Sequence, residues 1–213
     1  MIEDVLKREG IIAIIRGQYS LAEQFNIAKS LIAGGVNIIE ITLNSKYALK
    51  AIEQLKSSFP NVIAGAGTVL SRQDVDNAIA AGASFLISPN FDVEVVKQAQ
   101  KQNTLFISGV FTATEAQAAY KADCKILKLF PADALGPKYL KALNAPLDKI
   151  SFVPSGGINV NTIESFHRAG AVAFGVGSAL VKQVDYMDTK NLNELTKNAH
   201  ILASALELAR ANA

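Results

Sequence analysis

The sequence is poor in the residues that build disulfides and metal sites. It has one cysteine, two histidines and no tryptophan among 213 residues. The single Cys124 excludes an internal disulfide, which fits a reducing cytoplasm. His167 and His200 lie far from it in helical patterns, so we expect no metal site. We expect no cofactor either, because "GAGTVL" has Leu70 where a dinucleotide fingerprint needs its third glycine or alanine.

Long apolar runs and an excess of one charge are also missing. The run "IIAII" is too short to span a membrane, and the first ten residues are acidic where a secretory signal needs a basic region. Lysines and arginines number 21 and acids 19, a formal net charge of +2. We therefore expect a cytoplasmic protein that binds neither nucleic acid nor membrane.

The residues that are present indicate one globular domain over 1–213, because half are hydrophobic and 19% are charged. Short apolar runs alternate with amphipathic stretches. The candidate strands begin at Gly10, Val36, Asn61, Ser84, Thr104, Cys124, Ile150 and Ala171, and the range 192–211 predicts a closing helix. Eight alternations of strand and helix predict an α/β fold, a single-domain TIM (β/α)8 barrel, with an open doubly wound sheet as the main alternative.

A lysine stands inside the apolar segment "ILKLFPAD", where Lys128 needs a partner or a function. In the second strand, Glu40, Thr42 and Asn44 alternate with apolar residues and should face the lumen of a barrel. Strands two and six contribute to the same side-chain layers, so Glu40 and Lys128 can approach each other. A structural ion pair is the alternative, but such a pair stabilises poorly and these residues lie near the catalytic end of the fold.

A buried lysine and a glutamate suit covalent chemistry on ketones. Burial disfavours an ammonium ion, and the neutral amine of Lys128 would attack a ketone to form an iminium, an electron sink for the adjacent carbon–carbon bond. Glu40 would move protons. Arg16 could hold the carboxylate of a keto acid beside Thr68, although a salt bridge at the rim is an alternative role. Other polar residues end strands nearby: Ser88, Asn90 and Thr112.

Two glycine–serine loops follow the seventh and eighth strands, where barrels of this kind bind phosphate. "PSGGI" contributes Ser155, Gly156 and Gly157, and "FGVGS" contributes Gly177 and Ser178. Tight turns alone are the alternative explanation. Two such loops at the two expected strands favour a phosphate site.

The motifs "GGVNIIEITLNS", "AGAGTVL", "LISPN", "LKLFPAD" and "PSGGI" together resemble the KDPG/KHG aldolases, in order and over nearly the whole chain. The resemblance implies a TIM barrel, a homotrimer and no metal. It implies cleavage of a phosphorylated keto acid, 2-keto-3-deoxy-6-phosphogluconate, to pyruvate and glyceraldehyde 3-phosphate, and some members act on 4-hydroxy-2-oxoglutarate.

The resemblance also assigns roles to residues. It implies that Lys128 in "KLFP" forms the Schiff base, that Glu40 in "EITL" is the acid/base and that Thr68 contacts pyruvate. The substrate-binding set that we expect is Arg16, Thr68, Asn44, Pro89, Phe130, Ser155, Gly156, Gly157, Gly177 and Ser178.

One departure leaves the substrate open. Asn44 stands where phosphogluconate-specific members have an arginine. Two segments are instead similar to the 6-phosphogalactonate branch: "AIIRG", which contains Arg16, and "LGPKYLKAL". "SGGI" and Asp133 are closer to the gluconate type. Two other hypotheses remain: a sugar-phosphate epimerase or isomerase that uses Lys128 only electrostatically, and a phospholigand-binding barrel without turnover.

Overall fold

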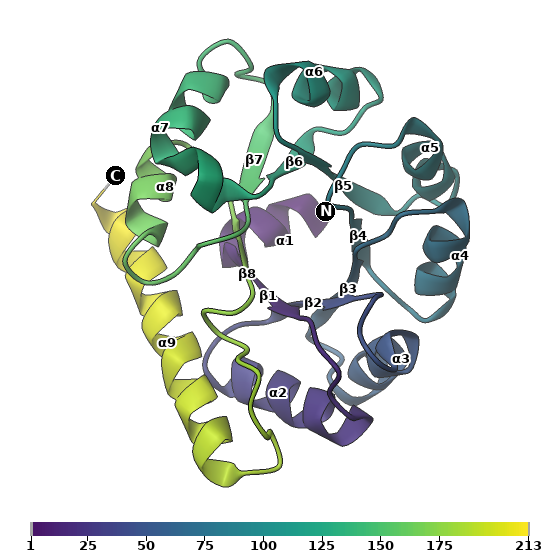
Figure 1. Ribbon diagram of the computed structural model, residues 1–213, viewed down its shortest axis with the longest axis vertical. Coiled ribbons are helices and arrows are strands. Elements are labelled where there is room, and N and C mark those ends of the chain that lie inside the picture. The colour runs from purple at the N-terminus through teal and green to yellow at the C-terminus, as the bar shows by residue number, and fades with distance from the viewer. Residues whose placement is uncertain (1, 213) are drawn as a thin grey trace.

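A barrel of eight parallel strands forms the centre of the computed structural model, which describes residues 2–212, and helices surround it (Figure 1). The strands are β1 (Ile11–Ile15), β2 (Ile38–Thr42), β3 (Ile63–Gly67), β4 (Phe85–Ile87), β5 (Leu105–Val110), β6 (Ile126–Leu129), β7 (Ser151–Pro154) and β8 (Phe174–Val176). The helices are α1 (Ile2–Glu9), α2 (Leu21–Ala33), α3 (Ala48–Ser58), α4 (Arg72–Ala80), α5 (Val93–Lys101), α6 (Ala113–Lys121), α7 (Ala132–Asn144), α8 (Ile163–Arg168) and α9 (Thr189–Ala211).

The strand order closes the sheet on itself. Neighbouring strands follow the chain from β1 to β7, and β8 pairs in parallel with β1. The remaining seam between β7 and β8 is bridged at Phe152–Ala171 and Ser155–Gly175. An open doubly wound sheet would leave two free edges, so this topology excludes it and confirms the predicted single-domain (β/α)8 barrel.

The barrel has an outer and an inner apolar layer. The outer layer lies between the strands and the helices, where Ile39 and Ile41 of β2 belong to the larger core cluster. The inner layer fills the lower lumen with the side chains of Ile12, Ile38, Phe85, Ile87, Ile107, Ile126, Val153 and Ala173. Side chains alternate across each strand, so one face of every strand supplies each layer.

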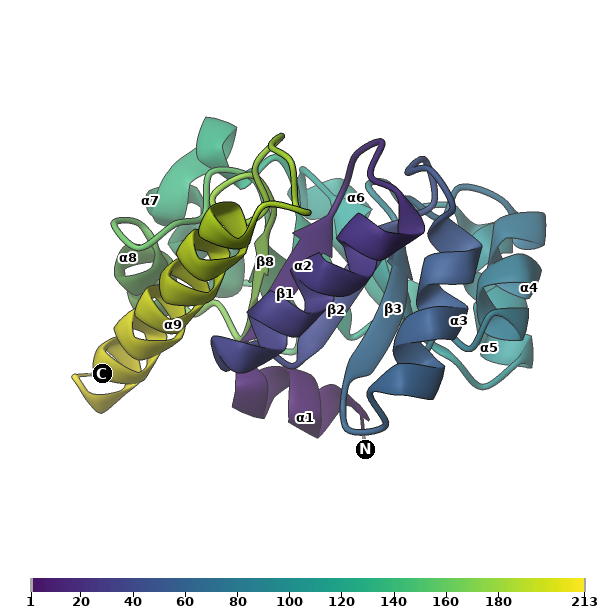
Figure 2. The same ribbon diagram turned by 90° about the horizontal axis from the view of Figure 1, so that it is seen from below.

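Helix α1 closes the N-terminal end of the barrel (Figure 2). Leu6 from this helix is buried in the same cluster as the inner-layer residues, and Ile2 packs against that cluster. The sequence pattern did not indicate this plug. Because it covers one end with apolar side chains, polar side chains of the lumen face the opposite end, which is turned to the viewer in Figure 1.

Helix ends follow their sequence signals. Ser20 caps α2 in a reciprocal capping box with Glu23, and the chain turns at Gly34 and Gly35 before β2. The predicted closing helix is confirmed as α9, which begins at Thr189 because the Asp188 carboxylate accepts a hydrogen bond from Lys190 N–H. Among the residues of 2–212, no helix is long and apolar enough to cross a membrane.

Candidate active site

Lys128 lies on β6 with its side chain buried in the barrel, 4% exposed. Its register partners are Gly109 on β5 and Val153 on β7. A side chain at Gly109 would overlap the backbone of Pro89, so this part of the lumen is narrow. The Nζ atom lies 5.0 Å from the centre of the Phe130 ring. The amine therefore stands in a confined space with an aromatic ring beside it.

Glu40 is buried more deeply, at 1% exposed, between Ile14 of β1 and Gly65 of β3. Its carboxylate occupies the space that a side chain at Gly67 would take, so only glycine fits at that position. Its Oε1 atom is buried without a hydrogen-bond partner in the described part of the chain. Burial raises the pKa of the Glu40 carboxyl, while the charges of Lys128 and Arg16 act to lower it.

The structural ion pair considered from the sequence is not formed. Between residues 2 and 212, no ion pair includes Lys128 or Glu40, although the two charges interact through the lumen. A buried polar atom without a partner costs stability. An unpartnered carboxyl oxygen near an unpaired amine is the arrangement that a polar ligand or a water would complete.

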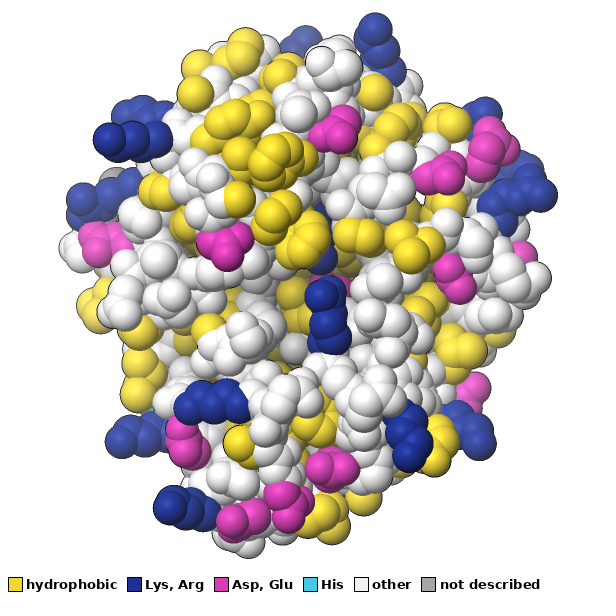
Figure 3. All heavy atoms as spheres, viewed as in Figure 1, with side chains coloured by type: hydrophobic (Ala, Val, Ile, Leu, Met, Phe, Trp, Pro, Cys, Tyr) yellow, Lys and Arg dark blue, Asp and Glu magenta, His cyan; other side chains and the backbone are white. Residues whose placement is uncertain are grey.

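A cavity of about 450 Å³ opens at this end of the barrel. Ile14, the register partner of Glu40, and Phe130, two residues beyond Lys128, both line it. The space-filling view shows basic side chains in the hollow at the centre of this face (Figure 3). Lys128 and Glu40 therefore lie next to the walls of an open, positively charged cavity.

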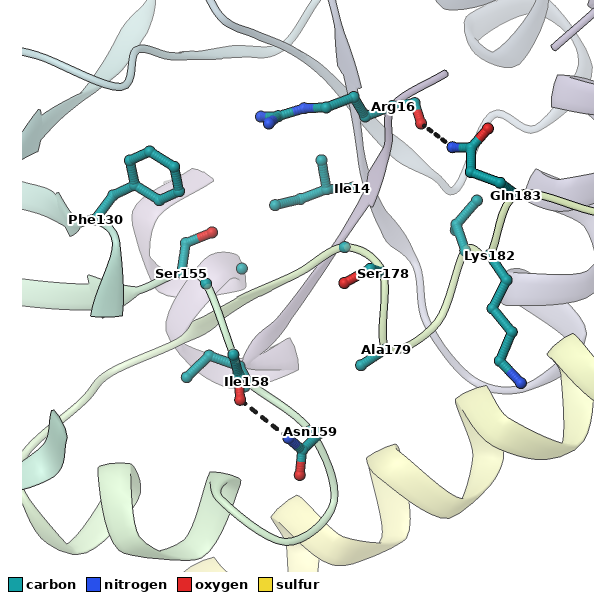
Figure 4. A pocket seen from close by; sticks show the side chains of 15 residues that line it. Ile14, Arg16, Phe130, Ser155, Ile158, Asn159, Ser178, Ala179, Lys182 and Gln183 are labelled. Atoms are coloured by element: carbon teal, nitrogen blue, oxygen red, sulfur yellow. Dashed lines mark hydrogen bonds between the residues drawn. The ribbon is translucent and has the colours of Figure 1, made fainter. Parts of the chain in front are cut away.

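Arg16 follows β1 and sends its guanidinium over the cavity toward Phe130 (Figure 4). It enters no ion pair with any described residue. The other cation in the wall, Lys182, runs away from the cavity and binds Glu194 at 2.8 Å. Arg16 is therefore the lining cation that remains available to an anionic ligand.

The two glycine–serine loops form the opposite part of the wall. Gly156 and Gly157 have φ angles of +96° and +69°, a conformation that side chains other than glycine adopt with strain. In the described chain, the backbone N–H groups of Gly156, Gly157 and Ser178 donate to no protein acceptor. The hydroxyls of Ser155 and Ser178 turn into the cavity (Figure 4). Unpaired N–H groups with two hydroxyls make a site for an oxyanion such as phosphate.

Three predicted binding residues lie outside this cavity wall. Asn44 is exposed in the turn after β2, and Pro89 follows β4 beside Gly109. Thr68 follows β3 with a φ angle of +58°, which is unusual for a β-branched residue and marks a strained site. The structure brings Arg16, Phe130, Ser155, Gly156, Gly157, Gly177 and Ser178 together in one cavity.

Two of the hydroxyls at strand ends near the site form local hydrogen bonds. The Ser88 hydroxyl bonds the backbone of Asn90, and Thr112 forms a capping box with Glu115 at the start of α6. Serine and threonine at strand ends readily make such local bonds, which their position in the sequence alone does not reveal.

Sequence reasoning missed several lining residues, namely Ile14, Ile158, Asn159, Gly175, Ala179, Val181, Lys182 and Gln183. Ile14 shares the strand parity of Arg16, so the alternation along β1 could have indicated it. Gln183 lies in an irregular segment after β8, where no periodicity predicts side-chain direction.

Comparisons with known proteins agree on one family. Residues 2–198 match the family described as KDPG and KHG aldolase. The chain is 34% identical over 171 residues to the 2-dehydro-3-deoxy-phosphogluconate aldolase of Dickeya dadantii, which covers 80% of both chains. It is 35% identical over 174 residues to a Rhizobium meliloti protein named "Probable 2-dehydro-3-deoxy-6-phosphogalactonate aldolase", which covers 81% of this chain and 82% of that one.

A solved structure gives the same result. The KDPG aldolase of Legionella pneumophila, with pyruvate captured at low pH as a covalent carbinolamine intermediate, has a TM-score of 0.85 and 31% identity, over 93% of this chain and 96% of that one. The sequence comparison and the structural comparison therefore identify the same family over almost the whole length of the chain. The chain belongs to the KDPG and KHG aldolase family and is an aldolase.

Proposed function

We propose that this protein is a class I aldolase that cleaves a 2-keto-3-deoxy-6-phospho sugar acid to pyruvate and glyceraldehyde 3-phosphate. The observation that carries the proposal is the buried Lys128 amine, close enough to interact with the unpartnered Glu40 carboxyl, next to a cavity with free backbone N–H groups. A ketone at Lys128 and a phosphate at the glycine–serine loops would occupy the two ends of one site.

In the proposed reaction the unprotonated Lys128 amine attacks the C2 ketone and forms a carbinolamine. Loss of water gives an iminium. Removal of the proton from the C4 hydroxyl then breaks the C3–C4 bond, its electron pair moves into the iminium, and glyceraldehyde 3-phosphate leaves. Protonation of the resulting enamine at C3 and hydrolysis release pyruvate and free Lys128. The carbinolamine of the Legionella pneumophila relative supports this route.

Glu40 is proposed to carry the protons, directly or through a water. Burial raises the pKa of its carboxyl, so it holds a proton more readily than an exposed glutamate and can act as an acid and a base in turn. Its Oε1 atom has no protein partner in the described chain, which leaves it available to substrate or water.

The remaining residues are proposed to orient the substrate. Arg16 would hold the carboxylate with two parallel hydrogen bonds, helped by Thr68. Asn44, Pro89 and Phe130 would complete the sugar-acid end. The phosphate would bind the loops of Ser155, Gly156, Gly157, Gly177 and Ser178, whose free N–H groups and hydroxyls suit it.

Borohydride trapping tests the proposed function. The protein is incubated with pyruvate and borohydride, and peptides are analysed by mass spectrometry. We expect a reduced pyruvate adduct on Lys128. Absence of an adduct, with binding of phosphate esters retained, would instead favour an epimerase, an isomerase or a non-catalytic phospholigand-binding barrel.

Replacing Arg16 by alanine should weaken the binding of the keto acid carboxylate. Loss of a charge-assisted contact of about 1.5–3 kcal/mol should raise the pyruvate half-saturation in the trapping assay by about ten- to a hundredfold. Arg8→Ala, at the opposite end of the barrel on α1, is the control. An unchanged half-saturation in Arg16→Ala would remove Arg16 from the carboxylate site.

The C4 configuration of the substrate is decided by a side-by-side assay. The 6-phosphogluconate and 6-phosphogalactonate derivatives are compared, with 4-hydroxy-2-oxoglutarate as the third candidate. Asn44 and Arg16 favour the galactonate type, while Ser155 and Asp133 favour the gluconate type.

Two further parts of the proposal concern assembly and compartment. The motif resemblance supports a homotrimer, and the single cysteine supports a location in the cytoplasm.

A further inference from the structure

The first and the last loops at the mouth of the barrel are joined across one wall of the cavity. The loop after β1 carries Arg16, and the loop after β8 carries Ser178 and Gln183. The side-chain amide of Gln183 donates a hydrogen bond of 3.1 Å to the backbone carbonyl of Arg16. Figure 4 shows this amide turned to the Arg16 main chain while the guanidinium extends over the cavity.

Gln183 is exposed, but the main chain that presents it is firmly held. The Tyr19 hydroxyl donates to the Lys182 carbonyl at 2.6 Å, and the Lys182 N–H donates to the Tyr186 hydroxyl at 2.8 Å. Tyr19 and Tyr186 are 5% and 2% exposed, and their rings pack edge to face with centres 5.6 Å apart. Lys182, the residue before Gln183, is therefore held through both its main-chain N–H and its carbonyl.

The main chain of Arg16 is also held from the other side. Gly17 N–H donates to the Ser45 hydroxyl at 3.1 Å, and Lys46 N–H donates to the Gly17 carbonyl at 3.2 Å. The Arg16 side chain forms no ion pair with described residues, so its direction depends on where this main chain stands. The Gln183 contact links it to the phosphate-side loop.

We propose that Gln183 is a positioning residue that sets the Arg16 main chain so that the guanidinium meets the substrate carboxylate. The inference rests on the proposed role of Arg16. A bidentate contact tolerates little displacement, so loosening its support weakens carboxylate binding. Gln183 acts before the covalent step, and the rate of imine formation at saturating pyruvate does not depend on it.

The test is Gln183→Met, which keeps the length of the side chain and removes the N–H donor. Pyruvate half-saturation is measured by borohydride trapping. We expect a rise of about three- to tenfold, the range for one hydrogen bond, with an unchanged trapping rate at saturation and an unchanged thermal midpoint. Gln18→Met is the matched control, because Gln18 is exposed on the same loop as Arg16 and has no hydrogen bond to any described residue. An unchanged half-saturation in Gln183→Met overturns the inference.

A double variant separates positioning from direct contact. In the Arg16→Ala background, Gln183→Met should change the half-saturation no further, because its effect passes through Arg16. An additional rise there would mean that Gln183 binds substrate itself and would overturn the inference. If Arg16→Ala alone has no effect, the proposed role of Arg16 fails first; if only Gln183→Met has none, the positioning inference fails alone.

Discussion

Lys128→Ala should abolish cleavage, with a loss of at least about 10⁴-fold in turnover, because removal of a covalent nucleophile leaves only binding and electrostatic contributions. Lys128 is the buried lysine in the described chain, and the lysine that lines the cavity, Lys182, points away from it to Glu194. Among the described residues, no other amine is placed to replace it. Turnover with the phosphorylated keto acid and pyruvate adduct formation under borohydride are measured together, and both should vanish.

The control for this variant is Lys125→Ala. Lys125 lies in the same segment, just before β6, and is exposed in an ion pair with Asp123. We expect full activity from it. Circular dichroism should show that Lys128→Ala remains folded, since the substitution removes a buried amine and adds no polar group. Near-normal turnover of folded Lys128→Ala would rule out the Schiff-base route.

Glu40→Gln should separate imine formation from carbon–carbon cleavage. The amide keeps the shape that Gly67 accommodates but cannot take up or release a proton at neutral pH. Loss of a general acid/base typically costs about 10²–10⁴-fold, and we expect a fall of this size in cleavage, while pyruvate trapping on Lys128 persists in part. Single-turnover cleavage and borohydride trapping are the two measurements.

Glu53→Gln, on the exposed surface of α3, is the matched control and should behave like the unmodified protein. Unimpaired cleavage by Glu40→Gln would reduce Glu40 to a structural neighbour of Lys128. Equal loss of trapping and cleavage would instead place Glu40 in the dehydration of the carbinolamine.

The same variant should alter how stability depends on pH. Burial raises the pKa of Glu40 in the folded chain, so the folded state binds this proton more tightly than the unfolded state. That contribution to stability is full below the ordinary pKa of glutamate and is lost as the pH rises through the raised value. Glu40→Gln lacks this loss, so its thermal midpoint should exceed that of the unmodified protein more at about pH 8 than at about pH 5. A constant difference would contradict the raised pKa.

The sequence by itself determined the fold class and which polar residues face the lumen. Strand parity is a local property with a period of two residues, so Glu40 and Lys128 could be assigned to the lumen without coordinates. The conformational freedom of glycine is also local, and the doublet Gly156–Gly157 could therefore be recognised as a loop that exposes backbone N–H groups. Both features depend on neighbours in the chain.

Only the tertiary structure decided what surrounds that centre. Helix α1 packs into the end of the barrel, and Gln183 bonds Arg16, 167 positions away in the sequence. The Glu40 carboxyl oxygen is left without a partner among the described residues. Each of these features depends on segments that share no local sequence pattern. Thr112 is the opposite case, because its hydroxyl lies near the mouth of the barrel but caps the N-terminus of α6 by a local hydrogen bond. Which polar atoms are paired depends on which distant loops lie next to each other. That arrangement of the loops is stabilised by the packing of the whole barrel.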